Sequence, residues 1–110
     1  MAMVHAKGTP LLNEAASAGV EFLAEDIVPT NGRARLRFTI SSDTATDLLC
    51  HVTELDDPSN TTAFEVLNGT DLVVSGCSQG DIDVTSDFSY NFSLAASGTV
   101  LYFVCQEIRD

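Results

Sequence analysis

The last 25 residues of the chain, 86–110, constrain its fold more than any other stretch. In residues 88–94, large apolar side chains alternate with serine and asparagine, which is the period of a strand with one buried and one solvated face. Residues 95–98 contain the glycine that a hairpin loop usually needs, so we expect a hairpin here. Residues 99–108 then carry apolar side chains on both sides of a second strand. One side has Val100, Tyr102, Val104 and Ile108, and the other has Leu101, Phe103 and Cys105. Such a strand lies in the middle of a sandwich, or it packs one face on its own core and the other on a partner subunit.

The rest of the chain shows further short strands between turn signals. We expect strands at residues 20–26, 33–40, 46–54 and 61–67, and one that ends at Val84. Pro29 with Asn31 and Gly32 predicts a corner, and Asn68-Gly69 predicts a hairpin turn. Since no helical period of convincing length occurs, the pattern predicts an all-β fold: a single antiparallel β-sandwich, jelly-roll or Ig-like, of about 7–8 short strands.

Residues 1–19 show no steady period, so we expect an N-terminal arm before a sandwich domain of residues 20–110. In an assembly, such an arm can lie on a neighbouring subunit. No apolar run approaches the roughly 18 residues of a membrane span, and the N-terminal residues lack the apolar run of a secretory signal. We therefore expect no membrane contact and no export by a signal peptide.

Three of the chain's five Lys and Arg residues stand on one side of a single predicted strand. Within residues 33–40, Arg33, Arg35 and Arg37 alternate with apolar residues that face the core. Two explanations are open: the arginines pair with acids on an adjacent strand, or they form an interface row against an acidic neighbouring subunit. Opposite charges across a sheet favour the first by roughly 0.2–1 kcal/mol each. The surrounding acidity argues against an anion site.

The chain is strongly acidic, because 16 Asp and Glu against five Lys and Arg give a net charge of −11 at pH 7. Asp outnumbers Glu, and Lys7 is the single lysine beside four arginines. Self-repulsion of this size lowers stability in dilute salt and is screened within about 3 Å at 1 M salt. The balance favours a protein of a salt-loving organism over an ordinary acidic protein. It argues against nucleic acid as a partner, because binding of the phosphate backbone requires cations.

The three cysteines show no spacing that is typical of zinc sites. Cys50 and Cys105 lie within apolar strand runs, where a free cysteine behaves as a small apolar residue. A disulfide that joins Cys105 to Cys50 or to Cys77 is the alternative.

No arrangement of residues points to catalysis. The motifs of phosphate-binding loops, serine hydrolases and zinc proteases are absent from the sequence. Cys50 and His51 are neighbours on a predicted strand, so their side chains point to opposite faces and cannot form a nucleophile pair. The acid pairs Asp56-Asp57 and Asp81/Asp83 match no calcium-binding loop and are interpreted as solvated. We expect no enzyme activity, no metal and no cofactor.

Two stretches, residues 26–41 and 84–108, match a known pattern of strands and corners. A Pro-Thr-Asn corner at residues 29–31 opens the strand 33–40, and a Tyr-Asn-Phe strand at 90–92 leads through a glycine turn to a closing strand that ends in Gln-Glu-Ile at 106–108. This arrangement, over about 40 of the 110 residues, resembles small β-sandwich virion proteins of tailed viruses of bacteria and archaea. The chain departs from the pattern at residues 77–80, where a more apolar or aromatic strand is expected. The resemblance implies a structural role on a head, turret, neck or tail. Together with the acidic charge, it implies a virus of salt-loving archaea.

We therefore expect a structural virion protein that assembles on the capsid, turret or tail through its sandwich surfaces. Its partners are further copies of itself and other virion proteins, and its location is the virion, assembled in the host cytoplasm. The candidate interface residues are Arg33, Arg35, Arg37, Leu101 and Phe103. The alternative is a non-catalytic, adhesin-like module that binds a host surface glycan or another receptor through loops. The absence of tryptophan and the position of both tyrosines within strand runs argue against a sugar platform.

Overall fold

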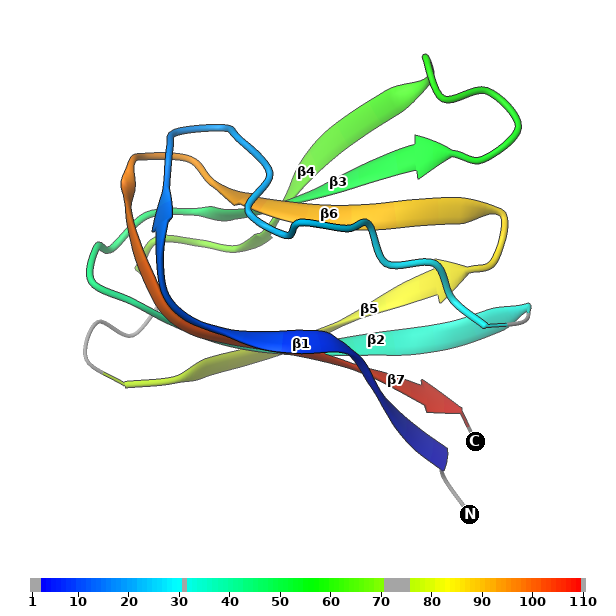
Figure 1. The fold of residues 1–110 in the computed structure, drawn as a ribbon, viewed down its shortest axis with the longest axis horizontal. Coiled ribbons are helices and arrows are strands. Elements are labelled where there is room, and N and C mark those ends of the chain that lie inside the picture. Colours follow the sequence, from blue (N-terminus) through cyan, green and yellow to red (C-terminus); the bar gives the residue numbers. More distant parts are fainter. Residues whose placement is uncertain (1–2, 31, 71–75, 110) are drawn as a thin grey trace.

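A computed structural model describes residues 3–30, 32–70 and 76–109 of the chain as two antiparallel sheets that pack face to face (Figure 1). Sheet A has the strand order β1-β7-β2-β5, and sheet B has the order β4-β3-β6. The strands are β1 (Met3–Ala16), β2 (Arg33–Ser42), β3 (Leu48–Glu54), β4 (Thr61–Leu67), β5 (Ser78–Thr85), β6 (Phe88–Leu94) and β7 (Gly98–Arg109). The predicted all-β sandwich is confirmed. The predicted strands at 61–67 and 88–94 match β4 and β6 in their bounds, whereas Asn31 of the predicted corner lies outside the described residues. The predicted solvated face of β6 is wrong, because its serines and its asparagine are buried. The predicted hairpin at Gly98 is also wrong, because β6 and β7 lie in different sheets.

The N-terminal region differs from the prediction, because most of residues 1–19 form a strand instead of an arm. β1 pairs with β7 of the same chain from Met3 opposite Arg109 to Ala16 opposite Gly98. The register shifts between Lys7 and Leu11, around Pro10. Proline has no N–H to donate, so it is tolerated at an irregularity of an edge strand. The sandwich therefore begins at Met3 and not at residue 20.

The strand predicted at 20–26 is wrong, because this part of the chain has no regular strand. Residues 17–30 instead cross to sheet B and run antiparallel along β6 (Figure 1). Gly19 N donates to Leu94 O at 2.8 Å, and Ile27 and Tyr90 exchange two backbone hydrogen bonds of 2.7 and 2.8 Å. This segment therefore covers the free edge of β6.

An asparagine side chain completes the cover where the backbone of this segment departs from strand geometry. Asn91 of β6 accepts a hydrogen bond from Leu23 N on its Oδ1 and donates one to Leu23 O from its Nδ2, each at 3.1 Å. Its Nδ2 also donates to Asp26 Oδ1 at 2.8 Å, and Ser89 Oγ donates to Asp26 Oδ2 at 3.2 Å. The Asn91 side chain is 3% exposed, so these contacts satisfy a polar group that is costly to bury alone.

Four aromatic rings join the two sheets and the covering segment. The Phe92 ring of β6 lies 5.6 Å from the Phe38 ring of β2 and 5.0 Å from the Phe103 ring of β7. Phe103 in turn makes an edge-to-face contact with Phe22 at 5.0 Å. Offset and edge-to-face ring pairs at these distances add to the free energy gained from burial alone. The centre of the core therefore lies between β6 and β7.

Gly80 of β5 lies directly opposite Phe38 in the sheet, and a side chain has no room there. A Cβ atom at this position would stand 2.6 Å from Phe38 Cζ, and the Phe38 ring is fully buried. We expect Gly80→Ala to lower the free energy of unfolding by about 1–3 kcal/mol, the usual cost of overpacking. Urea denaturation followed by circular dichroism measures this, with the exposed neighbour variant Gln79→Ala as control. Equal stability of the two variants would contradict the close packing described.

Candidate functional site

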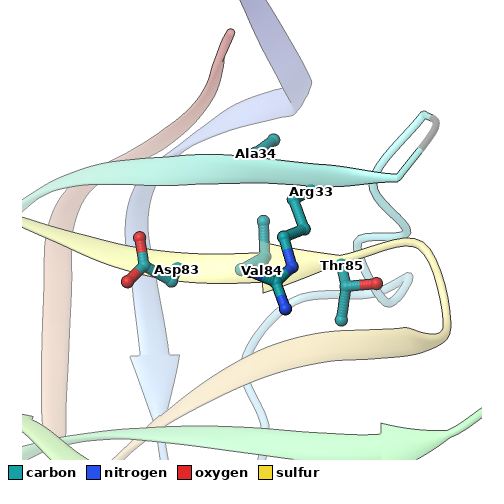
Figure 2. Close-up of a pocket in the computed structure, with 5 residues that line it drawn as sticks. All are labelled: Arg33, Ala34, Asp83, Val84 and Thr85. Carbon is teal, nitrogen blue, oxygen red and sulfur yellow. The ribbon is translucent and has the colours of Figure 1, made fainter.

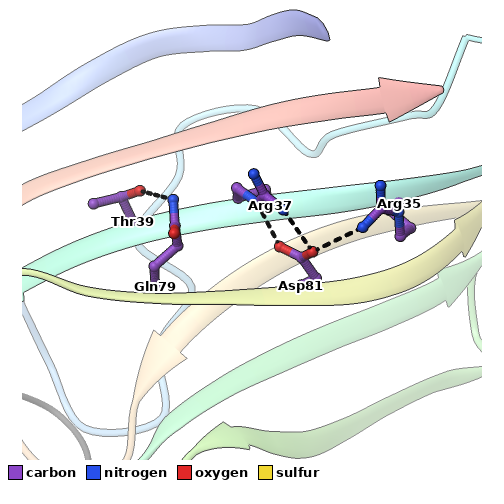
Figure 3. Close-up of polar contacts among 5 residues, drawn as sticks. All are labelled: Arg35, Arg37, Thr39, Gln79 and Asp81. Atoms are coloured by element: carbon purple, nitrogen blue, oxygen red, sulfur yellow. Dashed lines mark hydrogen bonds and ion pairs between the residues drawn. The ribbon is translucent and has the colours of Figure 1, made fainter. Parts of the chain in front are cut away.

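The arginine row lies on the outer face of sheet A, where β2 pairs with β5 (Figure 3). Arg37 binds Asp81 through two hydrogen bonds, from Nε to Oδ1 at 2.8 Å and from Nη2 to Oδ2 at 3.0 Å. Arg35 Nη1 donates to the same carboxylate at 3.2 Å. Of the two explanations for the row, pairing with an acid on the adjacent strand is thus confirmed for Arg35 and Arg37. Contact of the row with a partner subunit stays a prediction.

The Asp81 carboxylate has a pKa below its ordinary value, first because it accepts hydrogen bonds from Arg37 and then because of the nearby arginine charges. A group with a lowered pKa stabilises the fold at neutral pH, and this contribution disappears as the pH falls through the lowered pKa. We expect Asp81→Asn to cost less than about 1 kcal/mol at pH 7, because the pair is at the surface. The difference from the wild type should vanish in strong acid. Thermal unfolding from pH 7 to pH 2 checks this, and a constant difference would contradict the pairing.

Arg33, at the start of β2, lies apart from this cluster and lines a shallow surface pocket of about 300 Å³ (Figure 2). Its side chain extends across β5 toward Val84 and Thr85, and Asp83 lies at the other end of the pocket. Its backbone oxygen accepts a hydrogen bond of 3.0 Å from Arg109 Nη1. The pocket brings one cation and one carboxylate near a hydroxyl, with no nucleophile–base pair among its lining residues.

The outer face of sheet A also carries an apolar row on β7. Tyr102 lies opposite Ser41 of β2 and Leu12 of β1, and Val104 lies opposite Thr39. Tyr102 and Val104 are half-buried and do not belong to the core cluster, while Leu12 is 66% exposed. β7 therefore packs one face on its own core and turns an apolar second face outward. Contact of this second face with a partner subunit stays a prediction.

Leu101 and Phe103, the two β7 residues predicted to form an interface, do not belong to this apolar row. Phe103 is 2% exposed and lies in the core between aromatic rings, so its side chain is not on a surface. Leu101 is half-buried at a bulge, where Ser41 pairs with Tyr102 and Ser42 already pairs with Val100. Leu101 is the extra residue of this bulge, and it interrupts the alternation of side chains along β7. Val100, before the bulge, and Phe103, after it, therefore both point toward the core. The outward residues Tyr102 and Val104 are on the side of the strand that was not proposed as the interface.

A buried carboxylate lies near the end of β7. Glu107 is fully buried, and its Oε1 accepts a hydrogen bond of 2.8 Å from Thr30 N. Its Oε2 accepts one of 3.0 Å from Arg109 Nε. In the sequence, Glu107 is the one acid within an apolar strand run, and a single such group indicates no mechanism. In the structure it ties the corner before β2 to the closing strand, which indicates a structural role.

The cysteine side chains offer no reactive thiol in the core. Cys50 and Cys105 are free and buried, which agrees with the first interpretation of the sequence and not with a disulfide. Burial raises the pKa of Cys50 to about 12 and also raises the pKa of Cys105, so both remain thiols at neutral pH. In the described part of the chain, no three His, Cys, Asp or Glu side chains gather as metal ligands, and no helix is suited to cross a membrane.

The fold and this face define the chain as a β-sandwich protein with a mixed apolar and arginine-rich sheet surface. A scan against protein-family models and a search of curated proteins found no match for the chain.

Proposed function

We propose that the chain is a structural subunit of a virus particle, which assembles on a capsid, turret or tail through the outer face of sheet A. The observation that carries this proposal is the outward apolar row of β7 beside the Arg35–Arg37–Asp81 cluster. Monomeric proteins usually expose polar side chains on the outer face of a sheet, whereas apolar groups rimmed by charged groups are typical of contacts between proteins.

The two stretches that resemble virion proteins form one structural unit in this chain, which supports the proposal. Ile27 of the first stretch pairs with Tyr90 of the second, and Thr30 of the first binds Glu107 of the second. β2 also pairs with β7 over most of its length. The similar residues are therefore neighbours in the fold, as expected for a pattern that reflects a shared architecture.

The glycan-binding alternative finds less support in the same structure. Sugar platforms use exposed aromatic rings, and Tyr90 is 4% exposed in the core. Its hydroxyl accepts a hydrogen bond of 3.0 Å from Thr85 N and so is engaged within the chain. Tyr102 is half-buried within the face proposed for assembly.

The direct test is to look for the protein in particles released by a culture that carries its gene. Particles purified by density gradient would be digested with chymotrypsin, because residues 38–108 contain no Lys or Arg for trypsin. We expect peptides of this chain in a fixed proportion to the main capsid protein. If the protein accumulates in lysed cells but not in purified particles, a structural role in the virion is wrong.

A paired substitution tests the face itself. Val104→Asp places a charge in the apolar row, and we expect it to prevent incorporation into particles without unfolding the chain. Ala24→Asp adds the same charge at an exposed position of the segment that covers β6 of sheet B, away from the proposed face, and should leave incorporation unchanged. Equal incorporation of both variants would show that assembly uses another surface.

The proposed origin in a salt-loving host predicts a stability that depends on salt. At a net charge of −11, we expect the midpoint of thermal unfolding to rise by about 10 °C between 0.1 M and 2 M KCl, which is roughly 2 kcal/mol for a domain of this size. Circular dichroism measures it, and sucrose in place of KCl separates screening from solute exclusion. A midpoint that does not change with KCl would contradict the halophilic origin.

A further inference from the structure

The edge strands of the two sheets are protected to different degrees. In sheet A, the edge strand β1 contains Pro10 at a register shift, and the edge strand β5 carries the exposed acids Asp81 and Asp83. In sheet B, residues 17–30 cover β6 through backbone hydrogen bonds. Proline, irregular pairing, charges and covering segments are the usual means by which proteins prevent strand addition.

Within the part of the chain that the structure describes, β4, the other edge of sheet B, lacks these protections along its first four residues. Thr61, Thr62, Ala63 and Phe64 are uncharged and exposed, and they pair with β3 on one side. Within the described residues, no strand pairs with the other side of β4. Its one register irregularity lies beyond Glu65, near the end of the strand. The N–H and C=O groups of this edge are therefore available to a further strand.

The core-facing side of β4 is also incompletely covered. Phe64 lies opposite Cys50, which is fully buried, so the Phe64 side chain is on the core side of sheet B. Phe64 is nevertheless 42% exposed, which places it among the most exposed large apolar residues of the chain. Thr62, on the same side, is also exposed. A strand added at this edge would bury apolar surface in addition to forming backbone hydrogen bonds.

The charge of the chain indicates which partner this edge accepts. A second copy carries the same net charge of −11, so two copies can approach closely only where acids do not face each other. Antiparallel pairing of two β5 strands would bring Asp81 and Asp83 together across the contact. Residues 61–64 carry no charge, and pairing centred on Ala63 would place Glu65 of one copy opposite Thr61 of the other.

We propose that two copies of this chain join through antiparallel pairing of their β4 strands, around a twofold axis at Ala63. In this register Thr62 faces Phe64 of the second copy. The two Phe64 rings are then diagonal neighbours on the core side, within reach of each other at about 7–8 Å between Cα atoms. Sheet B continues across both copies. The contact does not use the outer face of sheet A, and it does not depend on the proposed function.

The test measures mass by light scattering after size exclusion, over a range of protein concentrations in molar KCl, where screening acts within about 3 Å. A contact of one short strand is at the low end of interface size, so we expect dimerisation to depend on concentration. The mass should approach twice the 11.7 kDa of the monomer at the highest concentrations. A mass that stays at the monomer value throughout would overturn the proposal.

A charge exchange at Ala63 identifies the contact. Ala63 is exposed at the axis, so Ala63→Asp and Ala63→Lys each bring like charges together and should each be monomeric. An equal mixture of the two variants should recover the dimer, because opposite charges then face each other. The same two substitutions at Gln79 on β5 are the controls and should not change the mass. A dimer that the Ala63 variants leave intact would overturn the proposal, and its loss in Val104→Asp would place the contact on sheet A.

Amide hydrogen exchange of the wild type provides a second measurement that needs no variant. Protection of residues 61–64 should increase with protein concentration by about tenfold or more, while the amides of β5 stay unchanged. Concentration-dependent mass without any change in β4 protection would overturn the proposal.

Discussion

Replacing Phe92 by alanine is expected to remove much of the stability of this protein, by about 3–5 kcal/mol. The ring is fully buried and contacts the rings of Phe38 and Phe103, so it joins β6 of one sheet to β2 and β7 of the other. Its removal leaves a cavity between the sheets that the remaining rings cannot fill without leaving their packed positions. Domains of this size have only about 5–15 kcal/mol of stability in total. Urea denaturation at constant molar KCl measures the loss.

The matched control is Phe64→Ala, which removes the same side chain from the exposed edge strand β4. Because Phe64 is 42% exposed, its replacement should cost less than about 1.5 kcal/mol when the protein is monomeric. Similar losses for the two variants would mean that the ring cluster around Phe92 does not hold the sheets together.

The second large effect is expected from Arg109→Ala, at about 3 kcal/mol. Arg109 Nε binds the fully buried Glu107 carboxylate at 3.0 Å, and Arg109 Nη1 donates to Arg33 O. Without the guanidinium, the buried carboxylate loses the charge-assisted hydrogen bond from Arg109, although the hydrogen bond from Thr30 N remains. Removal of one member of a buried ion pair costs more than the intact pair contributes. Urea denaturation at pH 7 measures this difference.

A double variant separates charge from packing at this site. In Glu107→Gln/Arg109→Ala no buried charge is left, so the double variant should be more stable than Arg109→Ala alone. Glu107→Gln by itself is the necessary third member of this cycle. If the double variant is instead the less stable one, loss of side-chain packing and not of charge explains the effect.

The parts of the fold that the sequence predicted well have strong local patterns. The strict alternation in residues 88–94, and the apolar Phe64 and Val66 within residues 61–67, predicted two strands with the correct bounds. The alternation of arginines with apolar residues predicted which side of β2 faces the core. The local pattern was sufficient to predict these strands, but not the cover of their faces. The Ser89, Asn91 and Ser93 side of β6, predicted to be solvated, is buried, and Phe64 of β4 is 42% exposed.

Other parts depended on contacts with distant residues. β1 contains Gly8, Pro10 and Asn13, which disfavour a regular strand, and it is held by pairing with β7 at the other end of the chain. The apolar residues of 20–26 suggested a strand, but the Asn91 side chain binds the backbone of Leu23 in place of a strand partner. Neither contact has a signal in the local sequence.

The candidate site shows the same division within a single strand. The amino-acid sequence by itself determined that β7 has two apolar sides, that β2 carries a row of arginines and that the chain is acidic. These properties follow from composition and from local alternation, which do not depend on contacts with distant residues. The tertiary structure decided which side of β7 faces outward, because the bulge at Leu101 arises only when β7 pairs with β2. The tertiary structure also decided which strands form the edges of the two sheets, because an edge strand is one that pairs on one side only. Which strands pair is set by contacts between residues far apart in the sequence.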